Sequence, residues 1–374
     1  MIALLHHRYR HAGGEERAVE DLAWLIREHL GEDVEVLERA SAEVSSRDAA
    51  LGLVRGGLHP EEVADAVRRT GARVVHAHNV HPTFGPRALE AAKRAGARVV
   101  VHLHNYRLVC AVGTCFTRGA DCTRCHGRNT LPGVALNCRG ASRAEAAAYA
   151  AGLALHQRRL LAAADALIVP SAFARDRLLA LGAPLHDAHV LGSVQRDFAP
   201  RSRAAAGEYV LAAGRLTPEK GFADVVDACQ AAGLPLVVAG DGPERERLQA
   251  RAPAVRFTGQ VGAQELAALR SRAAVAVVPS RYAEILPLAA LEAMAAGLPT
   301  VAARSGGLAE AVPEEGLYAP GDVPALVERL RALYGDAAAG ERALAAARAR
   351  WAPEVIADAL AGVYGRNFAP SARL

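Results

Sequence analysis

Short apolar segments recur along this 374-residue chain, and the longer stretches between them have the composition of helices. The strand-like segments of the first half lie at 2–6, 34–37, 74–77, 99–103 and 166–169, and those of the second half lie at 209–213, 236–239, 255–261 and 273–278. Strands that alternate with helices are typical of a parallel sheet with helices on both faces. We therefore expect an α/β protein with two doubly wound, Rossmann-like sheets, in which ligands bind at the carboxyl ends of the strands.

A polar stretch without periodicity, residues 195–207, separates the two series of strands. Such a stretch is typical of a domain linker. We predict an N-terminal domain over 1–197 and a C-terminal domain over 208–350, with residues 322–349 helical. A terminal segment, 351–374, is expected to contain a last helix that starts near Trp351 and Pro353 and ends at Tyr364.

The composition is that of an ordinary globular protein, with 51% hydrophobic and 22% charged residues. The formal net charge of +4 is too weak to favour nucleic-acid binding. No apolar run reaches the roughly 18 residues of a transmembrane helix, and the apolar start of the chain is short for a signal peptide. We therefore expect a cytoplasmic protein, with peripheral membrane contact through the N-terminal domain as an open alternative.

The segment that follows the apolar strand 273–278 contains two carboxylates, Glu284 and Glu292. Residues 288–296 have the composition of a buried helix, and Pro287 suits its first position, where no backbone N–H is needed. The free N–H groups of a helix start form an anion site, and two carboxylates beside it would suit the hydroxyls of a sugar nucleotide. In the alternative interpretation, Glu284 caps the helix and Glu292 pairs with a nearby arginine.

A second polar segment follows the strand 209–213 and contains Arg215 and Lys220 between glycines. Lysine is rare in this chain: of 44 basic residues only Lys93 and Lys220 are lysine, so its use here is informative. A forked guanidinium and a compact ammonium are complementary tools for binding phosphate. The alternative is a solvated turn.

Two neighbouring strand ends in the first half are rich in histidine. His76 and His78 lie at one strand end, and His102 and His104 lie at another. Because side chains alternate along a strand, the members of each pair share a face. Hydrogen-bonded histidines at a sheet edge are the simpler interpretation, and a four-histidine metal site is the alternative.

The segment 107–140 has no apolar periodicity and holds five of the six cysteines. We expect an insertion-like loop. The spacing of Cys110, Cys115, Cys122 and Cys125 permits a tetrahedral zinc site, whereas free thiols are the alternative. Disulfides are disfavoured in a cytoplasmic protein.

These segments together resemble the GT4 family of retaining glycosyltransferases, which have the GT-B fold: two Rossmann-like domains with a cleft between them. The resemblance rests on Glu284-x7-Glu292, the Ala-rich helix after it, the Gly-Gly loop at 305–307 and Arg215-x4-Lys220, and it extends through most of the chain. One departure is Asn105, which stands after His104 where the family often has aspartate.

The resemblance implies that the terminal helix within 351–374 crosses back onto the N-terminal domain and that the Cys-rich loop 107–140 shapes the acceptor site. It also implies roles for particular residues. His104 and Glu284 would be catalytic, through contacts with the transferred sugar. The residues that would contact the donor are Gly14, Arg215, Lys220, Val261, Ile285, Leu286 and Glu292. Arg215 and Lys220 would neutralise the diphosphate, Glu292 would hold the ribose, and the backbone near Val261 would lie beside the base.

The predicted function is retaining transfer of a hexose from a UDP- or GDP-sugar to an unknown acceptor, such as a glycan or a lipid-linked intermediate of cell-envelope or polysaccharide synthesis. No Asp-x-Asp sequence occurs, so no metal on the diphosphate and no other cofactor is expected; a structural zinc in the Cys-rich loop is the alternative. Two other functions stay open. One is a sugar-nucleotide epimerase of the same fold, and the other is a metal- or nucleic-acid-binding protein that acts through the Cys/Arg loop.

Overall fold

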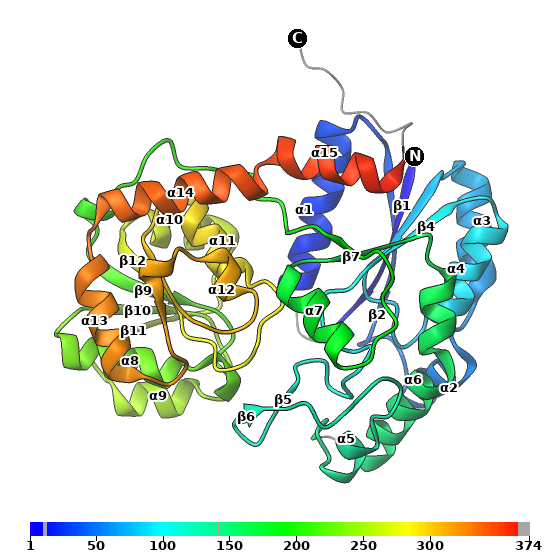
Figure 1. Cartoon of the computed structure of the whole chain (residues 1–374), viewed down its shortest axis with the longest axis horizontal. Coiled ribbons are helices and arrows are strands. Elements are labelled where there is room, and N and C mark those ends of the chain that lie inside the picture. The colour runs from blue at the N-terminus through cyan, green and yellow to red at the C-terminus, as the bar shows by residue number, and fades with distance from the viewer. Residues whose placement is uncertain (10–12, 141, 366–374) are drawn as a thin grey trace. The chain divides into compact units, whose positions relative to one another are not determined.

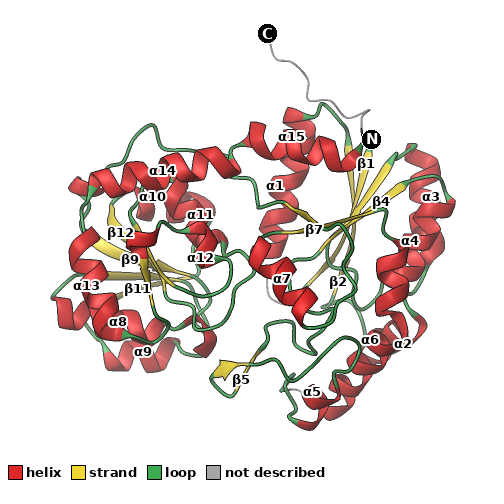
Figure 2. Ribbon diagram, in the orientation of Figure 1, coloured by secondary structure: helices red, strands yellow, loops and turns green. Residues whose placement is uncertain are grey.

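The computed structural model describes residues 1–9, 13–140 and 142–365, which divide into two compact units (Figures 1 and 2). The first unit comprises residues 1–115, 122–194 and the C-terminal helix that begins at Pro353; the second comprises 116–121 and 195–352. Each unit contains one six-stranded sheet, and all strand pairs within these two sheets are parallel. The prediction of an α/β chain with two doubly wound sheets is therefore confirmed.

The sheet of the first unit has the strand order β2-β1-β3-β4-β7-β8. Its strands are β1 (Ile2–Arg8), β2 (Val34–Ala40), β3 (Val74–Ala77), β4 (Arg98–His102), β7 (Ala166–Val169) and β8 (His189–Val190). The helices of this unit are α1 (Gly14–His29), α2 (Ser46–Arg55), α3 (Pro60–Thr70), α4 (Gly85–Arg94), α5 (Leu131–Ala135), α6 (Arg143–Ala163), α7 (Ala172–Ala180) and α15 (Pro353–Tyr364). The last of these, α15, packs against α1 although it ends the described chain (Figure 1).

The sheet of the second unit has the order β11-β10-β9-β12-β13-β14. Its strands are β9 (Tyr209–Ala213), β10 (Leu236–Ala239), β11 (Arg256–Gly259), β12 (Ala273–Val278), β13 (Thr300–Ala303) and β14 (Leu317–Tyr318). Its helices are α8 (Phe222–Ala232), α9 (Arg245–Arg251), α10 (Ala263–Ser271), α11 (Leu288–Ala295), α12 (Leu308–Ala311), α13 (Val323–Leu333) and α14 (Ala337–Trp351). The order of strands reverses between β9 and β12, and in such sheets this switch point is where ligands bind.

The central strand β12 shows why these residues form a sheet. All six of its side chains are buried, and successive side chains enter opposite faces. Val275 and Val277 join a core covered by α8 and α13, whereas Ala276 joins a second core that includes Leu269 of α10 and Ala293 of α11. A continuous apolar run is therefore required at this place.

Two predicted helix boundaries near the C-terminus are wrong. Residues 322–349 form two helices, α13 and α14, because the chain turns at Gly335, where φ is +74°. Asp336 caps the second helix and accepts the N–H of Ala339 at 3.0 Å. Trp351 ends α14, and the last helix begins at Pro353.

The Cys-rich segment 107–140 contains short regular elements. It forms a two-stranded antiparallel hairpin, β5 (Phe116–Thr117) and β6 (Ala120–Asp121), and the helix α5. The hairpin falls in the second unit, whereas the rest of the segment falls in the first.

Two glycines hold loops of the second unit close together. Gly221 has φ +71°, and a Cβ there would lie 2.3 Å from the carbonyl oxygen of Pro279. Gly306 has φ +58°, and a Cβ there would lie 2.2 Å from the carbonyl oxygen of Glu284. The loops that follow β9 and β13 therefore pack directly on the loop that follows β12, and only glycine fits at either contact.

We predict that Gly306→Ala lowers the free energy of unfolding of the second unit by about 2–3 kcal/mol, through backbone strain and the clash with Glu284. Gly233→Ala is the matched control, because φ there is +68° but no atom lies within 4 Å; it should cost only about 1 kcal/mol. The free energies are measured by urea unfolding in a Trp24→Phe background. Trp351 is then the only tryptophan, and its fluorescence reports on the second unit. Equal losses in both variants would contradict the proposed contact.

A buried histidine in the first unit links stability to pH. His7 is fully buried on β1, and its ring nitrogens lie 3.0 Å from the Thr83 hydroxyl and 2.9 Å from the Ser41 hydroxyl. Burial, together with the nearby cations of His6 and Arg39, lowers the pKa of His7 to about 4. The native ring is therefore neutral at pH values where an unfolded histidine is already protonated.

We predict that the first unit loses stability as the pH falls from 6.5 towards 4. In that window the unfolded state binds more protons, so each unit of pH costs about 1.4 kcal/mol through His7. His7→Asn should make the loss between pH 7 and pH 5 about 2 kcal/mol smaller. Urea unfolding in a Trp351→Phe background, followed through Trp24, measures the effect. His59→Asn, at an exposed position, should keep the wild-type slope.

Candidate active site

A buried ion pair lies at the switch point of the second sheet. Lys220 ends a 3₁₀ turn after β9, and Glu284 lies in the loop after β12. The Lys220 Nζ donates to Glu284 Oε1 at 2.8 Å, and the two side chains are only 18% and 7% exposed. The hydroxyl of Ser280 donates to the same oxygen, and that of Tyr282 donates to Oε2 at 3.3 Å. The carboxylate is therefore fixed by three donors.

The charges at this place favour an anionic ligand. Burial alone would lower the pKa of Lys220, but the Glu284 carboxylate and Tyr282 raise it above its usual value, so the amine is a cation. Arg215 is exposed, and its charge acts on both Lys220 and Tyr282. Over the described ranges of the chain no carboxylate pairs with Arg215. One cation is thus neutralised internally, and the second remains for a ligand.

The helix α11 presents its N-terminus at the same edge of the sheet. Pro287 is its cap residue with extended backbone, not its first helical residue as we expected. Among the residues that the structure describes, no side chain caps the helix, so the alternative in which Glu284 does so is wrong. The first N–H groups of α11 therefore remain available to an anion.

Glu292 pairs with an arginine, as the alternative interpretation predicted. Arg270 of α10 donates to its Oε2, and the two side chains are 14% and 19% exposed. Glu292 lies about one turn into α11, which begins at Leu288. Holding a ribose through Glu292 would therefore involve the oxygen that faces away from Arg270 or a shift of Arg270.

The other residues expected to contact the donor occupy strand ends and loops. Val261 follows β11 and is partly buried, and Ile285 and Leu286 continue the loop after Glu284, with Ile285 8% exposed. Gly14 is the exposed first residue of α1 in the first unit. The structure brings Lys220 and Glu284 together by direct contact; it describes Gly14 within a separate unit.

His104 follows β4 in the first unit and is part of a stack of imidazoles. Its Nε2 lies 2.8 Å from His78 Nδ1, and its ring stacks on His102 at 4.1 Å between centroids. Burial, and then the nearby His6, lowers the pKa of His104 to about 3. The side chain is therefore a neutral hydrogen-bonding group at neutral pH and not a cation.

The structure explains why asparagine follows His104. The Asn105 amide donates to the Tyr9 hydroxyl at 3.2 Å, and that hydroxyl donates to Glu15 Oε2 at 3.1 Å. An aspartate could not donate to Tyr9 and would add a second negative charge near Glu15. The amide therefore suits this network.

Sequence reasoning missed Glu15, in the first turn of α1. Burial raises its pKa to about 7, although Arg107 and Tyr9 oppose the shift. Arg107 packs its guanidinium over the Tyr9 ring, 4.6 Å from the centroid. Because the partners come from three separate segments, only the adjacent Gly13-Gly14-Glu15-Glu16 could have signalled this group.

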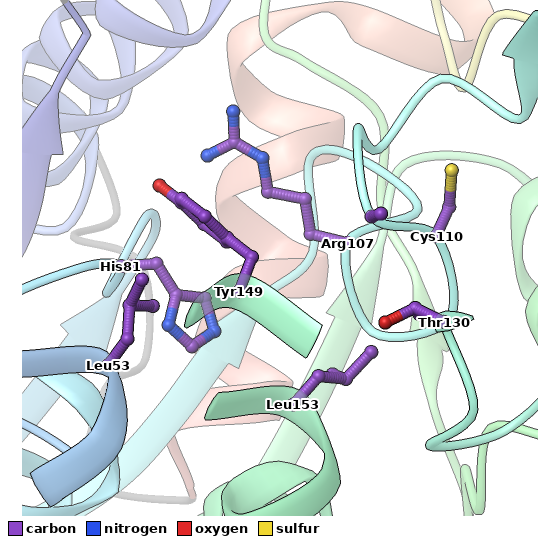
Figure 3. A pocket seen from close by; sticks show the side chains of 8 residues that line it. Leu53, His81, Arg107, Cys110, Thr130, Tyr149 and Leu153 are labelled. Carbon is purple, nitrogen blue, oxygen red and sulfur yellow. The ribbon is translucent and has the colours of Figure 1, made fainter. Parts of the chain in front are cut away.

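Arg107 also lines a small hollow in the first unit, shown in Figure 3. The lining residues are Leu53, His81, Arg107, Cys110, Ala111, Thr130, Tyr149 and Leu153. The Cys115 hydrogen bond lowers the pKa of the Cys110 thiol to about 5, against the effect of burial. Because Cys110, Ala111 and Thr130 line the hollow, the Cys-rich segment forms part of its wall.

All six cysteines are free thiols. Within the described ranges, the only group of three or more potential metal ligands with ligand atoms within 4.8 Å of one another is His76, His78 and His102. The sulfur atoms of Cys110, Cys115, Cys122 and Cys125 do not form such a group. The zinc alternative for the Cys-rich loop therefore receives no support from this geometry.

We predict that Lys220→Met lowers the free energy of unfolding of the second unit by about 3 kcal/mol, because it leaves a buried carboxylate without its cation. Adding Glu284→Gln should recover part of the loss, with a coupling of about 1–3 kcal/mol in a double-mutant cycle. Urea unfolding followed through Trp351 provides the values.

The control is the exposed ion pair between Arg272 and Glu208, which precede β12 and β9 at the amino ends of these strands. Arg272→Met should cost less than about 1 kcal/mol. Additive effects of Lys220→Met and Glu284→Gln would show that the pair is not energetically coupled.

The comparison with protein families identifies both halves of the chain. Residues 207–336 match the family described as "Glycosyl transferases group 1", and residues 13–193 match the "Glycosyl transferase 4-like domain". No helix in the described part of the chain is both long and apolar enough to cross a membrane.

Curated relatives match about half of the chain. Glycogen synthase of Mycobacterium tuberculosis is 37% identical over 228 residues, which is 55% of this chain and 55% of that protein. The sulfoquinovosyl transferase SQD2 of Arabidopsis thaliana is 38% identical over 205 residues, or 48% of this chain and 39% of that protein. The match thus spans about half the length of these relatives or less.

Solved structures match nearly the whole chain at low identity. Sucrose-phosphate synthase from Thermosynechococcus elongatus has a TM-score of 0.70 at 19% identity and covers 96% of both chains. Anabaena HepE in complex with UDP-glucose has a TM-score of 0.62 at 18% identity and covers 95% of this chain and 96% of its own. With both sheets accounted for by the matched families and structures, the chain belongs to the GT4 family of glycosyltransferases and has the GT-B fold.

Proposed function

We propose that this chain transfers a hexose from a nucleoside-diphosphate sugar to an acceptor with retention of anomeric configuration. The observation that carries the proposal is the pairing of Lys220 with Glu284 beside the unpaired Arg215, at the switch point between β9 and β12. Open α/β sheets bind ligands at this place. The family assignment favours transfer over the epimerase and nucleic-acid-binding alternatives.

The proposed chemistry depends on charge that develops on the leaving group. When the bond between the anomeric carbon and the diphosphate oxygen breaks, the electron pair stays with the diphosphate. Arg215, Lys220 and the uncapped N-terminus of α11 would stabilise this charge. Lys220 has three N–H groups, so it can keep its contact with Glu284 while it donates to phosphate. No metal on the diphosphate is part of the proposal.

The remaining contacts orient the donor. Glu284 would accept a sugar hydroxyl through Oε2, where its present contact with Tyr282 is long at 3.3 Å. Glu292 would hold the ribose, and the backbone at Val261, Ile285 and Leu286 would contact the nucleotide. Gly14 is the proposed contact for the phosphates and His104 the proposed contact for the sugar. The neutral state of His104 suits a hydrogen bond to a hydroxyl.

The names of relatives suggest donors and acceptors. HepE binds UDP-glucose, and several relatives are GDP-mannose-dependent mannosyltransferases, so we propose a UDP- or GDP-hexose as donor. One relative is a phosphatidylinositol dimannoside mannosyltransferase, which supports a glycan or lipid-linked acceptor. We further propose that the chain acts in the cytoplasm and contacts a membrane peripherally through its N-terminal domain. Arg159 of α6 contributes little to that contact, since it pairs with Glu90.

The test is calorimetric titration with UDP, GDP and ADP. One diphosphate should bind, and Arg215→Ala or Lys220→Met should weaken it about 10- to 100-fold, the equivalent of one lost charge-assisted hydrogen bond. Arg272→Met, at the other edge of the sheet, should bind as the wild type does. If no diphosphate binds to the folded protein, the donor site is wrongly assigned.

Retention has its own readout that needs no acceptor. Slow hydrolysis of the preferred donor, followed by proton NMR, should first release the free sugar in the donor's own anomeric configuration. First release of the opposite anomer would contradict a retaining mechanism.

A further inference from the structure

Four histidines gather at the carboxyl ends of β3 and β4 in the first unit. The rings of His76 and His78 stack at 4.5 Å between centroids, and His102 lies 5.5 and 5.4 Å from them. His76, His78 and His102 are at most 7% exposed. This packing of imidazoles goes beyond what the transfer reaction requires, because only His104 has a role there.

The three buried rings have nitrogens without partners. His76 Nε2, His78 Nε2 and both nitrogens of His102 are buried and have no hydrogen-bond partner in the described parts of the chain. A buried polar atom without a partner costs free energy, and such atoms are rare in folded proteins. A cluster of four such nitrogens therefore indicates that a ligand binds to them.

The geometry suits a metal ion. Each of the three histidines offers a nitrogen within 4.8 Å of the other two. Nitrogens bound to one tetrahedral zinc ion at about 2.0–2.1 Å would be about 3.4 Å apart, so the rings would turn towards one another when the ion binds. Three histidines and an open fourth position are an established zinc ligand set.

The outer contacts would fix the ring orientations. His76 Nδ1 lies 2.7 Å from the Tyr364 hydroxyl of α15, and His78 Nδ1 lies 2.8 Å from His104 Nε2. If both Nδ1 atoms carry the proton, both Nε2 lone pairs face the cluster. Histidines that ligate metals commonly use their second nitrogen in this way.

We propose that His76, His78 and His102 bind one divalent transition-metal ion, with zinc as the best match to three imidazoles. The ion would join β3 to β4, and through Tyr364 it would tie α15 to the carboxyl ends of these strands. It also sets the His78 tautomer so that the Nδ1–H donates to His104. The site shares no residue with the proposed diphosphate contacts, so loss of metal binding and loss of nucleotide binding are separate outcomes.

The experiment uses Co²⁺ as the probe, added to full-length protein that has been treated with a chelator. We expect one Co²⁺ per chain, with visible absorption typical of tetrahedral or five-coordinate cobalt. X-ray absorption spectroscopy of this wild-type complex should show nitrogen and oxygen ligands only. Tyr364→Phe should weaken Co²⁺ binding about 10- to 100-fold, as loss of an outer contact does. His102→Leu should weaken it by more than Tyr364→Phe does.

The control is the double variant Cys122→Ser, Cys125→Ser, which should bind Co²⁺ as the wild type does. Sulfur ligands in the wild-type spectrum, or loss of binding in this control, would assign the metal to the Cys-rich loop and overturn the proposal. Absence of stoichiometric binding by the folded wild type would also overturn it. Because the spectrum is taken on the wild type, the test does not depend on whether His102→Leu folds.

Discussion

The ion pair between Lys220 and Glu284 joins two loops of the second unit at the switch point of its sheet. The two residues are 64 positions apart in sequence and come from loops after β9 and β12, the strands on either side of the switch point. Burying a cation or a carboxylate alone is costly, so each requires the other. Gly221 and Gly306 allow the neighbouring loops to approach this pair at backbone contact. A phosphate at the proposed donor site would meet a cation already oriented by its carboxylate and a second cation, Arg215, that no carboxylate of the described residues neutralises.

Local patterns in the sequence predicted the frame well. The strands 74–77, 166–169, 209–213, 236–239 and 273–278 agree with the structure because each is an apolar run with clear ends. The break between α13 and α14 was missed although Gly335 and Asp336 mark it, because the Arg/Ala-rich composition on both sides favours a helix. Local propensity thus outweighed a two-residue turn signal.

Contacts between distant residues could not be predicted. The types and spacing of Arg215, Lys220, Glu284 and Glu292 indicated a phosphate and sugar site. They did not indicate that Lys220 and Glu284 pair directly or that Arg270 is the partner of Glu292.

The contacts among the histidines could not be predicted either. Strand alternation predicts which members of each pair share a face, whereas stacking depends on β3 and β4 being neighbours, and the partner Tyr364 is 288 positions from His76.

The first unit relies on neutral polar groups where the second relies on charges. His7, His76 and His104 have low pKa values because they are buried, and Glu15 has a raised one. Asn105 fits this setting, since an amide can donate to Tyr9 without adding charge beside Glu15. The second unit thus offers fixed cations, and the first unit offers neutral hydrogen-bonding groups.

The most direct test of the account is a crystal structure with the nucleoside diphosphate that binds most tightly. We predict phosphate oxygens within hydrogen-bonding distance of Lys220 Nζ and the Arg215 guanidinium, with the Lys220–Glu284 contact retained. A diphosphate bound elsewhere on the chain, with Arg215 and Lys220 untouched, would contradict the assignment of the switch point between β9 and β12 as the donor site.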